Sequence, residues 1–412
     1  MITPIVNAIP VFLALILLEA FVGWRGGRRI YRVQDAVTSL SLGMLSQIVA
    51  VFDKFFVVGI YILVWKYFRI VSLPPGSLLV WASALLLYDL CYYWSHRAGH
   101  EVNVLWAAHV VHHSSEDYNL STALRQTASG FLIGWIFYMP LALLGVPPLV
   151  FIFVGLVDLL YQFWVHTELV PYVAWLDRVL VMPSNHRVHH GRNDWCLDRN
   201  YGGIFMFWDV LFGTYTPERP DDPVIYGTLT PLASYDPLWG NLKIYADIWR
   251  RLRFHDRFFD RLGVLFARPG WQSALEASKF PQADVQPPIN RYDPPAHAGL
   301  KFYGMASLAF STVLLVQFLV IGPQLALVYR IGFGGLIALR LWALSQIWTG
   351  RRPALVLEML ATSLPLGFMA LGFWFVPLGT MARLVATLAL GSAIMLQSRS
   401  WRAMPSADQA DL

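Results

Sequence analysis

The chain has 412 residues, of which 56% are hydrophobic and 14% charged, and its mean hydropathy is +0.49. Soluble domains contain about 45–50% apolar and about 25% charged residues, so this composition excludes an ordinary soluble protein and predicts an all-α polytopic membrane protein. The only cysteines, Cys91 and Cys196, exclude a disulfide framework and give no support to a paired-thiolate metal site. The net charge of +5 comes from arginines beside apolar runs, which argues against a nucleic-acid-binding patch.

The first predicted element is a membrane span over residues 5–24, because a crossing helix needs about 20 mostly apolar residues. Four arginines between positions 25 and 32 follow it, and this positive charge predicts a cytoplasmic loop with the N-terminus outside. We expect the span to be retained, since it lacks the basic start of a signal peptide. Residues 36–66 are apolar but contain Asp53 and Lys54, so one long tilted helix and a re-entrant pair both remain open.

Residues 78–95 form the next predicted span, which ends directly at His96. Residues 129–147 and 149–165 predict a helical hairpin, whose second arm ends directly at His166. If residues 36–66 cross once, every histidine-rich segment faces the cytoplasm beside the arginine loop, as one shared site requires. A double crossing would break this agreement.

Residues 217–298 are the polar exception in the chain. Apolar residues recur there at helical intervals among arginines, which is typical of a helix in the membrane interface or of one packed on the preceding domain. Prolines in residues 281–298 predict a linker. We therefore expect a membrane-embedded domain over residues 1–216, an interfacial segment over 217–298, and C-terminal spans over 299–400.

The C-terminal part of the chain is again apolar. It predicts four further spans by the length criterion. These cover residues 300–321, 323–346, 354–377 and 380–397.

Nine of the eleven histidines lie between residues 96 and 190, most of them with helical spacing. They are His96 and His100; His109, His112 and His113; His166; and His186, His189 and His190. Neutral imidazole is the commonest nitrogen ligand of transition metals, and residues three or four apart share one face of a helix. Each cluster can therefore aim two or three nitrogens at one point, and the eight clustered histidines suit two metal ions.

The metal and the reaction follow from the place of these clusters. Structural zinc takes four ligands and has no redox chemistry, so iron is favoured if the reaction uses oxygen. The clusters are predicted where spans emerge, so that a lipid reaches the metals sideways while a reductant arrives from water. Oxidation of an unactivated C–H bond needs cofactor chemistry. We therefore hypothesise a membrane di-iron oxygenase, with a metal transporter as the competing class, although transport sites usually lie near the bilayer midplane.

Charged residues near the clusters leave two interpretations open. Asp89 and Asp158 either accept a hydrogen bond from a ligand histidine or lie exposed at the interface. Arg125, Arg187 and Arg192 either bind a lipid phosphate or neutralise acidic residues.

The histidine clusters, in this order, resemble those of the membrane fatty acid hydroxylase and sterol desaturase superfamily. Within it, residues 96–101 (HRAGHE) and 106–126 (WAAHVVHHSSEDYNLSTALRQ) are most similar to the alkylglycerol monooxygenase family. Three later stretches extend the resemblance: QFWVHTE at 162–168, NHRVHHGRNDWCLDRNYGG at 185–203 and WDVLFGTY at 208–215.

This resemblance implies a tetrahydrobiopterin-dependent cleavage of ether lipids, in which O2 is used to hydroxylate the alkyl carbon next to the ether oxygen. It implies that the eight clustered histidines hold two iron ions, that His166 is a ninth ligand or supports one, and that Glu101 is essential for function. A sterol desaturase or fatty-acid hydroxylase with the same di-iron site is the alternative. The protein would be a multi-pass protein of the bacterial inner membrane or the endoplasmic reticulum, with its histidines on the cytoplasmic side.

Overall fold

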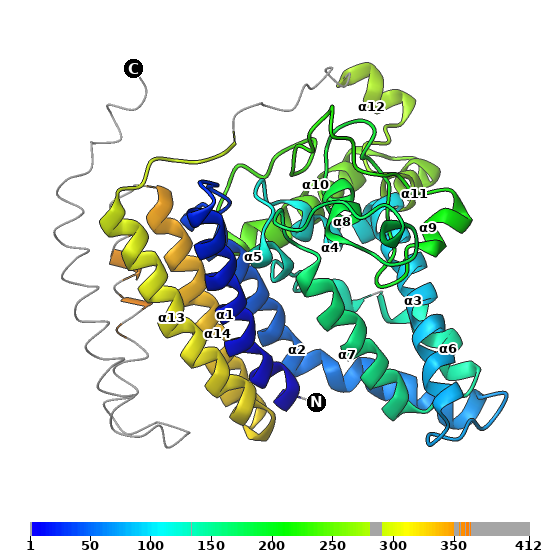
Figure 1. The fold of residues 1–412 in the computed structure, drawn as a ribbon. Coiled ribbons are helices and arrows are strands. Elements are labelled where there is room, and N and C mark those ends of the chain that lie inside the picture. The colour runs from blue at the N-terminus through cyan, green and yellow to red at the C-terminus, as the bar shows by residue number, and fades with distance from the viewer. Residues whose placement is uncertain are drawn as a thin grey trace.

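The fold is seen in a computed structural model that describes residues 2–132, 134–280 and 291–349, with residues 354, 356–358, 360, 361 and 363. Its regular elements are helices, and the described residues add only two isolated bridges, Leu180 to Phe205 and Gly191 to Tyr226. Figure 1 shows a bundle of long helices with a cap of short helices and loops at one end.

Five of the described helices are long and apolar enough to cross a membrane. They are α1 (Ile2–Arg25), α2 (Val33–Phe68), α3 (Leu78–Glu101), α13 (Ala298–Ile321) and α14 (Leu327–Gln346). Their outer faces expose large apolar side chains, such as Leu17 and Leu18 of α1, which are 70% and 55% exposed. This confirms the all-α membrane fold and the predicted spans that correspond to these helices.

Residues 36–66 lie within one continuous helix, α2, so the re-entrant pair is not formed. A helix of 36 residues is about 54 Å long, well beyond the thickness of a bilayer core. Figure 1 shows how the chain accommodates this length, since the second half of α2 runs obliquely toward α6 (Met139–Leu143).

The expected hairpin forms only in its second arm, α7 (Pro148–Trp164). The first arm, residues 129–147, was predicted wrongly as a span: it consists of the 3-10 turns η1 (Gly130–Leu132) and η2 (Gly134–Tyr138) followed by α6. Glycine and proline weaken a helix interior, and Gly145 ends α6 with a φ of +85°. A Cβ at Gly145 would lie 1.9 Å from the carbonyl oxygen of Val71, so the chain needs glycine there.

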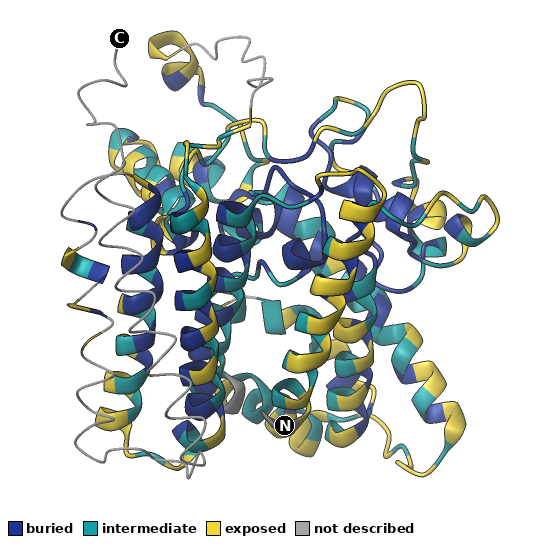
Figure 2. Ribbon diagram, turned by 60° about the vertical axis from the view of Figure 1, so that its left-hand side comes forward, coloured by how far each residue is buried: buried dark blue, intermediate teal, exposed yellow. Residues whose placement is uncertain are grey.

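The cap consists of short helices that connect the membrane ends of α3 and α7. They are α4 (Asn103–His113), α5 (Leu120–Ala123), η3 (Leu176–Arg178), α8 (Pro183–His189) and α9 (Phe207–Phe212). Buried residues gather in this cap and along the inward faces of the long helices (Figure 2). The cap therefore has its own core at the end of the bundle.

The polar segment forms α10 (Pro237–Phe254), α11 (Phe258–Phe266) and α12 (Ala274–Lys279). One face of α10 and α11 packs on α4 through Ile248, Val264 and Ala107, which supports the interpretation as a packed helix. The opposite face leaves Trp249 63% and Phe259 81% exposed, as an interfacial helix would. Both interpretations therefore describe part of this segment.

The C-terminal helices α13 and α14 pack against the first half of α2. Phe318, Leu341 and Leu344 are fully buried in this contact. Both helices agree with the spans predicted at 300–321 and 323–346. The 3-10 turn η4 (Gly322–Gln324) lies between them, and η5 (Ile347–Thr349) follows α14. The spans predicted at 354–377 and 380–397 and the first part of the linker at 281–298 lie largely outside the described residues.

Candidate metal centre

Each histidine cluster lies at a helix end that meets the cap. His96 and His100 are one turn apart at the end of α3, and α4 carries His109, His112 and His113. His166 lies two residues beyond α7, and α8 with its C-terminal cap residue carries His186, His189 and His190. The predicted helical spacing is therefore confirmed for all three clusters.

In the structure the nine histidines form two groups, and each group contains histidines from more than one of the sequence clusters. The five-histidine group contains His96, His100, His109, His113 and His189. The four-histidine group contains His112, His166, His186 and His190. In each group one ring nitrogen from every member lies within 4.8 Å of the others, so each group converges on one point.

The spacing of the ring nitrogens fits bound metal ions. In the five-histidine group, Nε2 of His109 lies 3.0 Å from Nε2 of both His96 and His113. In the four-histidine group, Nε2 of His166 lies 3.2 Å from that of His112 and 3.0 Å from that of His186. Two nitrogens that each lie about 2.1 Å from one ion are about 3.0–3.4 Å apart at angles of about 90–110°.

Backbone carbonyls fix the orientation of four of these rings. Each of the four donates Nδ1–H to a carbonyl oxygen 2.7–3.0 Å away, which leaves the Nε2 lone pair for a metal. The pairs are His96 with Tyr201, His112 with Arg125, His166 with Gln162 and His189 with Arg199.

Burial keeps the imidazoles in the neutral form that binds metals. Desolvation lowers the pKa of His112 to about 4 and lowers the pKa of His186 and His190 well below the ordinary value. Nε2 of His100 and of His189 are buried and have no hydrogen-bond partner among the described residues. A buried polar atom without a partner is costly, and a metal ion would satisfy both. The donor set therefore fits two transition-metal ions.

Asp89 and Asp158 do not match either of their predicted roles. Both are buried, with exposures of 0% and 3%, so they do not face the membrane interface. Asp89 accepts hydrogen bonds from the backbone N–H groups of Ile204 and Phe205, at 2.6 and 3.1 Å. Asp158 accepts one from the side chain of Gln162, at 2.5 Å. They therefore hold the segments whose carbonyls orient the histidines, rather than the histidines themselves.

Asp209 performs the same task and was missed by the sequence analysis. Its carboxylate accepts N–H groups from Tyr201 and Gly202, at 2.7 and 2.8 Å, and a hydroxyl from Thr214 at 2.6 Å. Because Tyr201 supplies the carbonyl for His96, Asp209 fixes that ligand from a distance. Desolvation raises the pKa of Asp209 to about 6. The WDVLFGTY stretch contained this residue, but nothing in its spacing singled it out.

All three flanking arginines have acidic partners inside the protein. Arg125 donates to Asp35 at 3.3 Å and to Ser39 at 3.2 Å. Arg187 makes two hydrogen bonds with Glu218, at 2.7 and 2.6 Å. Arg192 is 3.9 Å from Glu116. The structure thus supports the interpretation that these arginines neutralise acidic residues.

Glu101 lies at the rim of the five-histidine group. Its carboxylate accepts hydrogen bonds from Arg97 at 2.9 Å and from Arg268 at 3.2 Å. Arg268 follows α11, so Glu101 links α3 to the polar segment that covers α4. Glu101 follows His100 in the sequence. Among the described residues, however, its side chain makes ionic contacts with arginines and none with a histidine ring.

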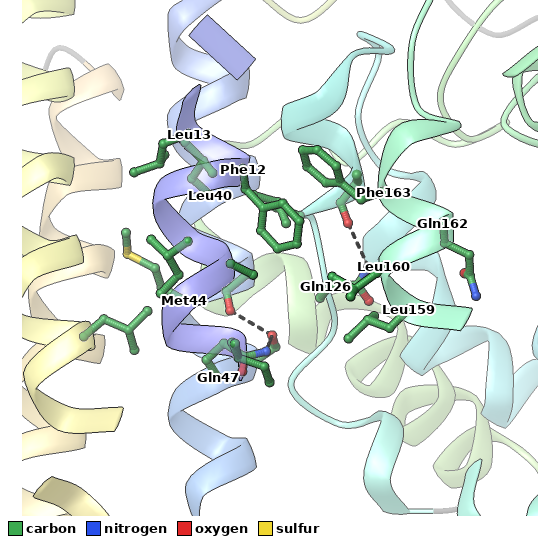
Figure 3. A pocket seen from close by; sticks show the side chains of 18 of the residues that line it. Phe12, Leu13, Leu40, Met44, Gln47, Gln126, Leu159, Leu160, Gln162 and Phe163 are labelled. Carbon is green, nitrogen blue, oxygen red and sulfur yellow. Dashed lines mark hydrogen bonds between the residues drawn. The ribbon is translucent and has the colours of Figure 1, made fainter. Parts of the chain in front are cut away.

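An elongated apolar cavity of about 160 Å³, here called the apolar chamber, lies between α1, α2 and α7 (Figure 3). Its walls are formed by side chains such as Phe12, Leu13, Leu40, Met44, Leu160 and Phe163. Two metal-ligand candidates, His112 and His166, also line it. The chamber therefore extends from α1, α2 and α7 to the four-histidine group.

Comparisons with known proteins agree with this site. Residues 81–214, which contain all nine histidines, match the family model described as fatty acid hydroxylase. The chain is 44% identical to alkylglycerol monooxygenase of Homo sapiens over 266 residues, which are 64% of this chain and 59% of the relative. It is 46% identical to that of Danio rerio over 268 residues, 64% of this chain and 59% of the relative.

A longer match joins the chain to a third relative. It is 37% identical to alkylglycerol monooxygenase of Xenopus tropicalis over 353 residues, which are 84% of this chain and 78% of that protein. The human and zebrafish matches cover less than two thirds of those proteins, whereas this one extends through most of both chains. No solved structure is a significant match to the chain.

Proposed function

Because the chain belongs to the alkylglycerol monooxygenase family, we propose that it is a membrane monooxygenase that cleaves ether lipids of the alkylglycerol class. It hydroxylates the alkyl carbon next to the ether oxygen, and the hemiacetal so formed separates into a fatty aldehyde and a glycerol derivative. The observation that carries this proposal is the convergence of nine histidines, in two groups, beside an apolar chamber at the end of membrane-spanning helices. A candidate metal site and an apolar cavity are therefore adjacent there.

The two histidine groups hold one iron ion each in this proposal. The chemistry of the donor set supports iron, because neutral imidazole suits several transition metals and the related hydroxylases are iron-dependent. Bound iron supplies the activation of O2 that no side chain provides. The protein's own contribution is to keep the imidazoles neutral, to aim their Nε2 atoms and to exclude water from the chamber.

The reaction balances with one two-electron reductant. One atom of O2 enters the C–H bond and becomes the hydroxyl oxygen, and the other leaves as water after taking up two electrons and two protons. Tetrahydrobiopterin supplies both electrons and both protons in this proposal and leaves as a dihydropterin. The family resemblance supports this cofactor.

The arginine loop supports a cytoplasmic position of the site. It lies at the same end of the bundle as the histidines, where Arg28 donates to the carbonyl of Glu168 at 3.4 Å and Arg32 bonds Asp117 at 3.0 Å. Loops rich in arginine face the cytoplasm in most membrane proteins. We therefore propose that the metal centre lies at the cytoplasmic surface, within reach of a soluble reductant.

We assign Glu101 a positioning role in this reaction. Its ion pairs with Arg97 and Arg268 hold the end of α3, which carries His96 and His100, against the segment after α11. Glu101→Gln removes the charge from both pairs and is expected to lower kcat and bound iron together, with partial rescue by Glu101→Asp. A loss of kcat with unchanged iron in both variants would indicate instead that the carboxylate acts on the substrate or the reductant.

A fatty-acid hydroxylase or sterol desaturase is the second candidate function. The match of residues 81–214 to the fatty acid hydroxylase model favours it, because that match covers the whole histidine site. These reactions begin with the same C–H abstraction, so the ligands do not separate them. The similarity to alkylglycerol monooxygenases extends through 84% of the chain, which favours the ether lipid.

One assay distinguishes these functions. The purified, iron-loaded full chain in lipid nanodiscs receives an alkylglycerol, O2 and tetrahydrobiopterin, and fatty aldehyde is measured. We expect aldehyde release that requires all three. Absence of aldehyde, together with turnover of an acyl lipid or a sterol, would replace the ether-lipid proposal with the second candidate.

A further inference from the structure

We propose that the apolar chamber holds the alkyl chain of the lipid substrate and that the four-histidine group is the metal position at which this chain is oxidised. The ether-lipid identity of the substrate rests on the proposed function. The position of the chain in the protein does not, because it follows from the shape and the lining of the chamber.

The chamber touches only one of the two histidine groups. Its described lining includes His112 and His166, both of the four-histidine group, and no member of the five-histidine group. A chain in this space therefore reaches one metal position directly. The two positions are thus unequal, although their ligands are chemically the same.

The chamber is long and follows the direction of the helices. On α1 its lining extends from Pro4 to Leu13, and on α7 it extends from Leu156 to Phe163. At 1.5 Å per residue these stretches are about 14 and about 11 Å long. An extended alkyl chain advances about 1.25 Å per carbon at ordinary bond lengths and angles, so about eight to eleven carbons fit along this length.

The direction of the chain follows from the ends of the chamber. Phe163 and His166 lie at the cap end of α7, whereas Leu156 lies about two turns deeper in the bundle. Figure 3 shows Phe163 and Leu160 of α7 on one side of this space and Phe12 of α1 on the other. The ether end of the lipid is therefore at the histidines and the methyl end points into the membrane.

The wall of the chamber is suited to entry from the bilayer. α1 forms one side of it, and the other face of α1 exposes Val11 by 55% and Leu15 by 38%. Phe12 of α1 and Phe163 of α7 stack with their ring centroids 4.3 Å apart. Among the described residues, α1 therefore has one face on the chamber and another face on the exposed apolar surface.

The five-histidine group faces different surroundings. Nδ1 of His100 lies 3.8 Å from a carboxylate oxygen of Asp198, whose side chain is 42% exposed. His109 is the one histidine of the nine that is only half-buried. This side of the centre is therefore closer to water, where a soluble reductant arrives, while the four-histidine group is closer to the lipid.

Gln47 of α2 allows a test of the opposite orientation of the lipid, in which the glycerol head lies at the deep end of the chamber. Its Oε1 is buried and has no hydrogen-bond partner among the described residues, and its side chain lines the deep part of the chamber. An alkyl chain packs better against an apolar wall than against an amide, so Gln47→Leu should lower the KM for a C16 alkylglycerol. An increase in KM of tenfold or more would mean that a glycerol head occupies the deep end, and would overturn the orientation.

Photo-crosslinking tests the position of the chain without any turnover. Metal-free full chain in nanodiscs is irradiated with an alkylglycerol that carries a diazirine near carbon 8, or with one that carries it on the glycerol. We expect the chain probe to label α1, α2 and α7 residues of the chamber, and the glycerol probe to label the cap. Labelling of the chamber only by the glycerol probe, or labelling by the chain probe only outside the chamber, would overturn the proposal.

A chain-length experiment adds an independent test on active protein. Leu156→Trp fills the deep end of the chamber, whereas Val157→Trp on the same helix turn places the same ring at a residue that is 49% exposed and does not line it. We expect Leu156→Trp to lower kcat/KM about tenfold or more for a C16 alkylglycerol and less than threefold for a C8 one, with no such change in Val157→Trp. Equal losses for both chain lengths would contradict the proposal.

The two proposals fail separately. Chamber labelling without aldehyde release would remove the ether-lipid function and keep the chamber as an alkyl site for another lipid. Aldehyde release with labelling elsewhere would remove the chamber and keep the function.

Discussion

The orientation of four candidate ligands depends on backbone carbonyls, such as those of Tyr201 and Arg125, and not on acidic side chains. The histidines themselves could be predicted from the sequence, because a metal requires particular side chains at a particular spacing. Their partners could not, since any residue type carries a carbonyl. Asp209 was missed for the same reason, because it acts through two backbone N–H groups.

Loss of one ligand should remove metal without unfolding the protein. His112→Ala deletes a residue whose Nε2 lies 3.2 Å from that of His166, so the four-histidine group loses part of its convergence. We expect at least one iron to be lost and activity to fall by more than about 100-fold, with unchanged helical content by circular dichroism. His297→Asn, a change at a histidine that caps α13 outside both groups, is the matched control. Full iron content in His112→Ala would show that this residue is not a ligand.

Acid should destabilise the metal-free protein over a defined range of pH. Burial depresses the folded-state pKa of His112 from 6.5 to about 4, so the unfolded chain takes up a proton at a higher pH than the folded chain does. The stability from the neutral imidazole is present above about pH 6.5 and is lost as the pH falls toward 4. Thermal unfolding of chelator-treated protein should show Tm decreasing across this window. A constant Tm there would mean that the ring is not buried in the folded state.

At the scale of elements, hydropathy predicted the helices whose apolar runs are uninterrupted, including α1, α3, α7 and α13. It also left α2 open as one helix or two, since Asp53 interrupts the pattern without breaking the backbone. It failed for residues 129–147, where short 3-10 turns and the short helix α6 replace a spanning helix despite an apolar composition. The division of the histidines into groups of five and four could also not be predicted from the sequence, because it depends on how α4 and α8 are placed relative to each other.

Gly145 provides a test of the corrected region. A Cβ there would overlap the carbonyl of Val71, and the φ of +85° disfavours any other residue. Gly145→Ala should lower the free energy of unfolding by more than about 1 kcal/mol. Gly59→Ala, in the interior of α2 with no atom within 4 Å of the added Cβ, should be neutral or stabilising by up to about 1 kcal/mol. Tm measurements in one detergent compare the two, and equal effects would show that the turn at Gly145 is not formed.

At the scale of the whole molecule, the long helices bring every histidine cluster to one end of the bundle (Figure 1). The sequence predicted this arrangement from the parity of the spans, and the single helix α2 is what that parity required. The candidate metal centre at the bundle end has the apolar chamber on one side and the partly exposed Asp198 on the other. The cap therefore carries most of the histidines, while the membrane-spanning helices position the cap beside the chamber.

The metal content of active, purified full chain tests the central claim most directly. Two histidine groups, each converging on one point, predict two irons per chain by mass spectrometry of the metals, with activity proportional to iron across partly loaded preparations. Full activity in protein that contains only zinc, or a single iron per fully active chain, would contradict the account.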